Sequence, residues 1–370
     1  MPALYAHLRF GQEALRYLPS PFPYLIRHYP EAFLLGTQGP DILFYHQPLK
    51  KNELRAHGSY LHTLSGKEFF LAQAKKLVEG VRTNDVREVF ERHGAHAAYV
   101  CGFLCHFTLD AVCHPFIDYN SCYELSHARI ESEFDKYLLR ADGHPIRGYN
   151  TASPIKPIGG AKEAVARALD IPVEEAELSI RTMRKINKLF SFPLGLVHGV
   201  CHLGLSIVGM NHKFGDMFLY KQDHPLCDRA NEVLWDEFYN ALPIAADLIR
   251  VYMENLKFFI TQKTLHNSFL DQDFSGNEKL TFESLERPQP QPHPQAHPQA
   301  YPHPSAAPQG NDIPIGYPRP AFSENEPTPS GYPHPHPHTS FDGTQPPPNY
   351  PHRPAPSNGT DVPPNYPGAQ

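Results

Sequence analysis

The stretch from Ala97 to Asp135 places the strongest constraint on what this chain can fold into. Its first half, AYVCGFLCHFTLDAVCHPF, is apolar enough to form a helix buried on most sides, yet His106, Asp110 and His114 recur at four-residue steps. Side chains at that spacing lie on one face of a helix. Burying a carboxylate and two imidazoles without partners costs several kcal/mol, so a cation or a set of hydrogen-bond donors must meet them. A bound metal ion is the simplest such partner.

The second half of this stretch strengthens the metal prediction. The run HARIESEFDKYLL predicts a second amphipathic helix, with His127, Glu131 and Asp135 again four residues apart. Two adjacent helices therefore present HxxxD and HxxxE pairs, and imidazole nitrogen with carboxylate oxygen is a ligand set that zinc prefers. The alternative without a metal is a buried His–Asp hydrogen bond on the first helix and an exposed ion-pair face on the second.

Composition divides the chain into two parts. Of the 40 prolines, 25 lie from Pro288 onward, in repeats such as QPHPQAHPQAYPHP. Such a segment has too few aliphatic side chains to offset its chain entropy by burial. We therefore predict one folded domain over residues 1–270 and a disordered Pro/His/Tyr-rich tail over residues 271–370. The tail is a candidate for binding partners, although a solvated extension is the simpler interpretation.

The remaining composition limits the class of protein. The formal net charge of −6 predicts no general affinity for nucleic acid or anionic lipid. The first residues, MPALYAHLRF, lack the features of a signal peptide, and no apolar run reaches the length of a membrane span. We therefore expect a cytoplasmic protein whose membrane contact is at most peripheral. The cysteines lie mostly in apolar helical runs without a CxxC pair, which argues against a disulfide framework.

The hydrophobic periodicity predicts helices nearly throughout and no strands. The fold class expected is all-α, a single multi-helix bundle whose interior can hold ligands from facing helices. The predicted helices cover residues 11–17, 24–35, 53–79, 85–113 with an interruption at 94, 127–139, 162–169, 173–190, 194–210 and 228–263 with a kink at 243.

The loop LGTQGPDILFYH carries a separate candidate. Gly36, Gly39 and Pro40 predict a tight, non-helical backbone that presents Asp41 beside an apolar run. Asp41 could be a metal ligand, a general base, or simply the N-cap of the following segment.

Several histidines have weaker claims. His57 and His62 lie five residues apart on the next predicted helix, so only one of them is expected to point inward. His7 is most simply a hydrogen-bonded core histidine. We predict that His93 and His96 are surface residues and that the pair at 198 and 202 lines the core or a pocket.

The order of these features resembles the bacterial zinc-dependent phospholipase C family, in particular its non-secreted relatives. The resemblance covers about residues 1–265 and rests on an N-terminal histidine, the GPD loop, a following histidine, and then HxxxDxxxHP and HxxxE, most specifically in GTQGPDILFY and GFLCHFTLDAVCHP. It implies an all-α fold that holds two to three zinc ions.

The resemblance also implies a ligand set. His106 and Asp110 would be the central pair, with Asp110 bridging two ions, and Asp41 with His62 rather than His57 would complete the first site. The remaining ligands implied are His114, His127 and Glu131 in the second site and His7 in the third. In secreted members the N-terminal amine also binds the third zinc, and here only the residue after the initiator methionine could supply one. The aspartate matched by Asp41 is the candidate catalytic base.

The chemistry that follows is metal-assisted phosphoester hydrolysis of a phospholipid or a soluble phosphodiester. Zinc binds phosphate oxygens and lowers the pKa of a coordinated water to about 7. A di-iron bundle would show more carboxylates and ExxH pairs, and a phosphohydrolase of the HD type would show an adjacent His-Asp doublet. The alternative function is a non-catalytic, metal-stabilised helical scaffold whose tail recruits partners. About eight ligands for three ions would leave positions open for water, which favours catalysis.

Overall fold

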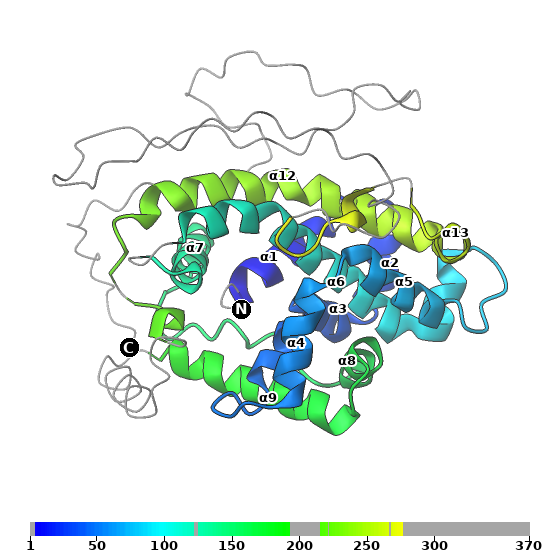
Figure 1. Ribbon diagram of the computed structural model, residues 1–370, viewed down its shortest axis with the longest axis horizontal. Coiled ribbons are helices and arrows are strands. Elements are labelled where there is room, and N and C mark those ends of the chain that lie inside the picture. The colour runs from blue at the N-terminus through cyan, green and yellow to red at the C-terminus, as the bar shows by residue number, and fades with distance from the viewer. Residues whose placement is uncertain (1–3, 122–124, 193–214, 221, 266–267, 277–370) are drawn as a thin grey trace, which may run out of the picture. The chain divides into compact units, whose positions relative to one another are not determined.

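The computed structural model describes the chain except for residues 1–3, 122–124, 193–214, 221, 266–267 and 277–370 (Figure 1). Every regular element in the described part is a helix, so the predicted all-α class is confirmed. The elements are α1 (Leu4–Ala14), α2 (Phe22–Arg27), α3 (Pro30–Gly36), η1 (Gly39–Tyr45), α4 (Glu53–Thr63), α5 (Gly66–Leu77), α6 (Val86–Asn120), α7 (His127–Ala141), α8 (Ala161–Leu169), α9 (Val173–Phe190), η2 (Gly215–Met217), α12 (Cys227–Glu254), α13 (Leu256–Gln262) and η3 (Ser268–Asp271).

Helix α6 is the centre of the bundle. Its residues 97–107 are fully buried, and it contacts α1, α3, α5, α7, α8 and α12. Figure 1 shows α12 running alongside it and α7 near its C-terminal end. By length and apolar composition α6 would pass as a membrane span, contrary to the expectation from the sequence, but 78% of its apolar window is buried inside the protein. A helix in the centre of a folded domain is also long and apolar, so these two properties do not identify a membrane span.

The bounds of α6 differ from the prediction at its C-terminal end. The expected interruption near Gly94 is present as a non-helical backbone at His93, but the helix continues through Pro115 to Asn120, whereas the sequence predicted an end at Cys113. A proline inside a helix removes one hydrogen bond and crowds the preceding turn. The turn that follows is nevertheless formed, and it carries Asp118 toward the start of α7.

Three other predicted helices are divided in the structure. The segment 24–35 forms α2 and α3 because Pro30 begins a new helix, and 53–79 forms α4 and α5 because Ser65 and Glu68 make a capping box between them. The segment 228–263 divides at Asn255, and α12 continues through Pro243.

The remaining predicted helices mostly agree with the structure. The N-terminal helix begins earlier than predicted and ends earlier, at Ala14. Helices α7, α8 and α9 match their predictions closely. The helix predicted over 194–210, with the histidines at 198 and 202, lies outside the described residues.

Helices α3 and α6 cross at two glycines. A Cβ atom on Gly36 would lie 2.1 Å from the Tyr99 carbonyl oxygen, and one on Gly102 would lie 2.2 Å from the Phe33 carbonyl oxygen. Gly36 is thus the last residue of a helix whose backbone touches α6, where the sequence predicted a residue of a non-helical loop. Because η1 follows α3 directly, this contact sets the position of Asp41 relative to α6.

The chain returns to α6 after α13. Phe269, Leu270 and Phe274 are buried, and the Gly66 N–H donates to the Gln272 carbonyl oxygen at 2.9 Å. The packed chain therefore continues to Gly276, beyond the boundary predicted at residue 270. A Cβ atom on Gly276 would lie 2.4 Å from the Ala111 carbonyl oxygen, so this segment lies directly against α6.

The predicted exposure of one histidine on α6 is wrong. His96 is buried, with 5% of its surface exposed, although it was predicted to be a surface residue. Burial, with smaller contributions from Arg167 and Lys76, lowers the pKa of His96 to about 3. Its neighbour His93 is partly buried, and its Nε2 donates to the Glu79 carbonyl oxygen at 2.8 Å.

Candidate metal centre

The eight residues predicted as ligands come together in three groups. Within each group the nitrogen and oxygen atoms that could bind a metal lie within 4.8 Å of one another. The groups are His7, His106 and Asp110; Asp41, His62 and His106; and His114, His127 and Glu131. Their ligand roles stay predictions, but the proximity of residues from α1, η1, α4, α6 and α7 is what a metal cluster requires.

Asp110 is the centre of these groups. Its Oδ1 lies 3.2 Å from Nε2 of His7 and 3.4 Å from Nε2 of His114, while its Oδ2 lies 3.1 Å from Nε2 of His106. The two histidines of α6 stand one turn before and one turn after it, as the four-residue spacing predicted. The third, on α1, approaches from a different element, so both carboxylate oxygens face imidazole nitrogens.

The electrostatics of this centre are strongly perturbed. Burial would raise the pKa of Asp110, but the surrounding imidazoles outweigh it and hold that pKa well below its usual range. Burial lowers the pKa of His106 to about 3, and neither of its ring nitrogens has a hydrogen bond. For His114 burial also lowers the pKa, but Asp110 and Glu131 prevail and raise it to about 9. The Asp110 carboxylate therefore stays ionised among these imidazoles and is available to a cation.

Asp41 lies in the first turn of the short helix η1. The N-cap of that helix is Gln38, so the interpretation of Asp41 as an N-cap is wrong. Gly39 brings η1 against α6, because it has a positive φ of +49° and a Cβ there would lie 2.2 Å from Cδ2 of His106. Burial tends to raise the pKa of Asp41, but nearby positive charge, to which His62 and His106 contribute, holds it well below its usual range.

The structure distinguishes the two histidines of α4. Nε2 of His62 lies 3.1 Å from Oδ1 of Asp41, and its Nδ1 donates to the Gly58 carbonyl oxygen at 2.8 Å. His57 instead donates from Nε2 to the Leu169 carbonyl oxygen at 2.9 Å and takes no part in the three groups. His62 is therefore the histidine of α4 that can bind a metal together with Asp41.

The third group joins the end of α6 to the start of α7. Oε1 of Glu131 lies 3.2 Å from Nε2 of His127 and 3.6 Å from Nε2 of His114. Burial lowers the pKa of His127, but the Glu131 carboxylate more than compensates and raises it. The imidazoles and carboxylate needed for one metal site are in place here without any contribution from α1.

Sequence reasoning missed Asp118. Its Oδ1 accepts a hydrogen bond from Nδ1 of His127 at 2.8 Å. Metal-binding histidines commonly donate their second nitrogen to a carboxylate, which fixes the ring and raises its basicity. The spacing was available in the sequence, since Asp118 follows His114 by four residues, but the predicted helix ended at Cys113 and so excluded Asp118.

The hydrogen bonds of His62 and His127 test whether a cation fits. In both rings Nδ1 donates to an oxygen that can only accept, and Nε2 faces a carboxylate oxygen. A neutral imidazole has one N–H, which is on Nδ1 here. Its unprotonated Nε2 would then direct a lone pair at a carboxylate oxygen, which is a repulsive contact. The arrangement is favourable only for an imidazolium or with a cation between Nε2 and the carboxylate. The residues present therefore fit zinc, which bare imidazole nitrogens and carboxylates bind.

Replacing Asp118 with asparagine is expected to weaken zinc binding at the third group by about 10-fold, because a neutral amide orients the His127 ring less strongly than a carboxylate. Competition with a chromophoric chelator would measure the zinc affinity. Asp247→Asn is the matched control, because Asp247 is a half-exposed residue of α12 that pairs with Arg250. Equal zinc affinities of the Asp118 variant and the wild type would show that Asp118 does not support His127.

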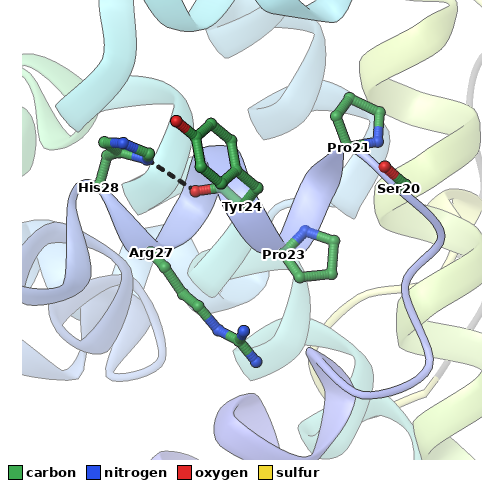
Figure 2. A pocket seen from close by; sticks show the side chains of 6 residues that line it. All are labelled: Ser20, Pro21, Pro23, Tyr24, Arg27 and His28. Carbon is green, nitrogen blue, oxygen red and sulfur yellow. Dashed lines mark hydrogen bonds between the residues drawn. The ribbon is translucent and has the colours of Figure 1, made fainter.

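An open hollow of about 470 Å³ lies along α2, as Figure 2 shows. Its lining residues come from α2 and the segments on either side of it: Ser20, Pro21, Pro23, Tyr24, Arg27 and His28. The His28 ring donates from Nδ1 to the Tyr24 carbonyl oxygen at 2.8 Å. None of the eight predicted ligands lines this hollow, so it is not part of the metal centre.

Comparisons with known proteins bear on the same part of the chain. Residues 6–175 match the family model described as zinc dependent phospholipase C, and this range contains all eight residues of the three groups. The resemblance seen in the sequence is thereby confirmed over that range. No curated protein and no solved structure matches the chain.

Proposed function

Because residues 6–175 match the zinc-dependent phospholipase C family, we propose that the protein is a zinc-dependent hydrolase that cleaves a phosphodiester. The match supports a zinc hydrolase of the phospholipase C type at the level of the family. The narrower proposal is that the substrate is a phospholipid or a soluble phosphodiester, and that the three groups bind two to three zinc ions.

The composition of the three groups is the observation that carries the proposal. They contain five imidazoles and three carboxylates, a nitrogen-rich set that suits zinc better than iron or magnesium. Three carboxylates would neutralise only half the charge of three zinc ions. The loaded centre would therefore be positive and would attract an anionic phosphodiester. Eight ligands also leave coordination positions open, as catalytic zinc sites require.

The residues in and around the three groups have distinct proposed tasks. When bound, zinc supplies Lewis acidity, an activated water and charge for the phosphate oxygens. Asp110 holds His7, His106 and His114 around one carboxylate, so the groups keep a common centre. Gly58 and Asp118 accept from Nδ1 of His62 and His127, which leaves Nε2 of each ring directed into the centre.

Asp41 has two proposed tasks. Its buried carboxylate with a lowered pKa suits a metal ligand. It is also the candidate to accept the proton of the attacking water, and its low pKa makes it a weak base for that step. Asp41→Asn should therefore lower both zinc content and kcat, whereas a base without a ligand role would affect kcat alone.

The test combines metal content with hydrolysis by the full-length protein. We expect mass spectrometry to find two to three more zinc ions per chain in the wild type than in a variant with His7, His106 and His127 replaced by alanine. Comparing full-length proteins cancels any zinc bound by the histidines of the tail. Activity is measured as headgroup phosphate released from phosphatidylcholine vesicles and as hydrolysis of a soluble aryl phosphodiester.

A chelator should abolish hydrolysis, and zinc should restore it. Zinc binding without hydrolysis of either substrate would support the non-catalytic scaffold and refute the hydrolase. Equal zinc contents of the wild type and the triple variant would refute the metal centre itself.

A further inference from the structure

The third member of the four-residue ladder on α7 has no part in the metal groups. His127 and Glu131 belong to one of them, but Asp135 lies one turn further along the same helix face and is absent from all three. It is nevertheless buried, with only 3% of its surface exposed. A buried carboxylate at this position needs partners, and its partners are on a distant part of the chain.

Asp135 binds the first turn of α1. Its Oδ2 accepts from the backbone N–H of Tyr5 at 3.1 Å, and its Oδ1 accepts from the backbone N–H of Ala6 at 2.8 Å. The first N–H groups of a helix have no partner within the helix, and the positive end of the helix dipole favours an anion there. Both oxygens of Asp135 therefore take up donors that α1 itself cannot satisfy.

The residue that follows these two donors is His7. Its Nε2 lies 3.2 Å from Oδ1 of Asp110, so its place in the first metal group depends on where α1 begins and how it is turned. A helix that moves by one residue rotates its side chains by about 100°. The hydrogen bonds of Asp135 to the N–H groups of Tyr5 and Ala6 fix where α1 begins and how it is rotated. They do so immediately before His7.

From this geometry we propose that Asp135 is a positioning residue that holds α1 in register so that His7 reaches the metal centre. The inference rests on the proposed zinc centre. It makes α7 the common support of two groups, since that helix supplies Glu131 to one and aligns His7 for another.

Another contact provides the matched control. Asp142, the C-cap of α7, accepts from the Tyr5 hydroxyl at 2.6 Å and pairs with Nε of Arg9 at 2.8 Å. It therefore also links α7 to α1, but through side chains and not through the first-turn backbone. A contact that merely stabilises the bundle should behave as Asp142 does.

The test measures zinc affinity in Asp135→Asn, His7→Ala and the double variant, all as full-length protein. An asparagine keeps the size of the side chain but can accept through only one of its two end groups. We expect Asp135→Asn to weaken the zinc ion of the His7 group by about 10-fold and to leave the other zinc ions bound. Its effect should vanish in the His7→Ala background, because both changes act on the same ligand. Asp142→Asn should leave all zinc affinities near wild type.

Hydrogen exchange of the Tyr5 and Ala6 amides gives a second readout that needs no metal. Both amides should exchange faster in Asp135→Asn, also after treatment with a chelator. Asp135→Ser, which keeps one acceptor oxygen, serves as a second variant should the asparagine variant not fold.

Two results would overturn the proposal. One is full additivity of Asp135→Asn with His7→Ala, and the other is an equal loss of zinc in Asp142→Asn. A protein that binds zinc through His7 but hydrolyses no phosphodiester would refute the proposed function and leave the role of Asp135 standing.

Discussion

Replacing Asp110 with asparagine is expected to empty most of the metal centre and to destabilise the protein. Asp110 faces Nε2 of three histidines, and the amide cannot supply two anionic oxygens to them or to the ions between them. Removing one partner of a buried charged cluster costs about 3 kcal/mol or more. For a domain of this size that corresponds to a melting temperature lower by roughly 5–10 °C.

Zinc content and thermal unfolding, each with and without a chelator, measure this prediction. In the wild type the chelator should lower the melting temperature, because bound zinc stabilises the folded state. In Asp110→Asn that difference should largely disappear. Asp247→Asn, on the solvent-facing side of α12, should behave like wild type. Unchanged zinc content in Asp110→Asn would remove the central role assigned to this carboxylate.

The second large effect is expected for Gly102→Ala in α6. Alanine favours a helix over glycine by about 1 kcal/mol, so helix propensity alone predicts stabilisation. Here the added methyl group would lie 2.2 Å from the Phe33 carbonyl oxygen and 2.9 Å from Cα of Gly36. Both are backbone atoms that cannot rotate away, and overpacking of this kind costs about 3 kcal/mol. The net expectation is a loss of about 2 kcal/mol in the free energy of unfolding.

Chemical denaturation measures this loss, and Gly58→Ala is the control. Gly58 also lies within a helix, but the nearest atom to its added methyl group is a side-chain atom, Cβ of Leu43, at 3.1 Å. Its stability should change far less. Because the α3–α6 contact also sets the distance from η1 to α6, Gly102→Ala should bind less zinc at the Asp41 group. A Gly102→Ala protein as stable as wild type would contradict the backbone contact.

The parts of the site that follow from local periodicity could be predicted from the sequence. His106, Asp110 and His114, or His127 and Glu131, share a helix face whatever the rest of the fold does. Asp41 was a candidate ligand from its loop alone, but His7 and His62 were proposed as ligands only because the order of motifs resembles a known family. The structure brings them to the same place, but no rule of spacing places η1 or α1 beside α6.

What the sequence could not supply depends on contacts between distant backbones. The predicted helix ended at Cys113, but α6 continues through Pro115 to Asn120, which is why Asp118 was overlooked. Gly36 was interpreted as a turn residue, although its lack of a side chain serves a helix crossing. Asp135 was recognised as part of a ladder, but its partners are main-chain N–H groups, which every residue except proline has. No residue type marks them.

The segment that ends at Gly276 has a further consequence for how the metal centre is enclosed. Phe274 lies with its ring 5.0 Å from that of His62 and 5.8 Å from that of His106. Phe274 is buried, and it comes from the last part of the described chain, whereas the two histidines come from α4 and α6. The residues after α13 therefore form one wall of the metal centre, and ending the chain before Phe274 would open that side of the centre to water.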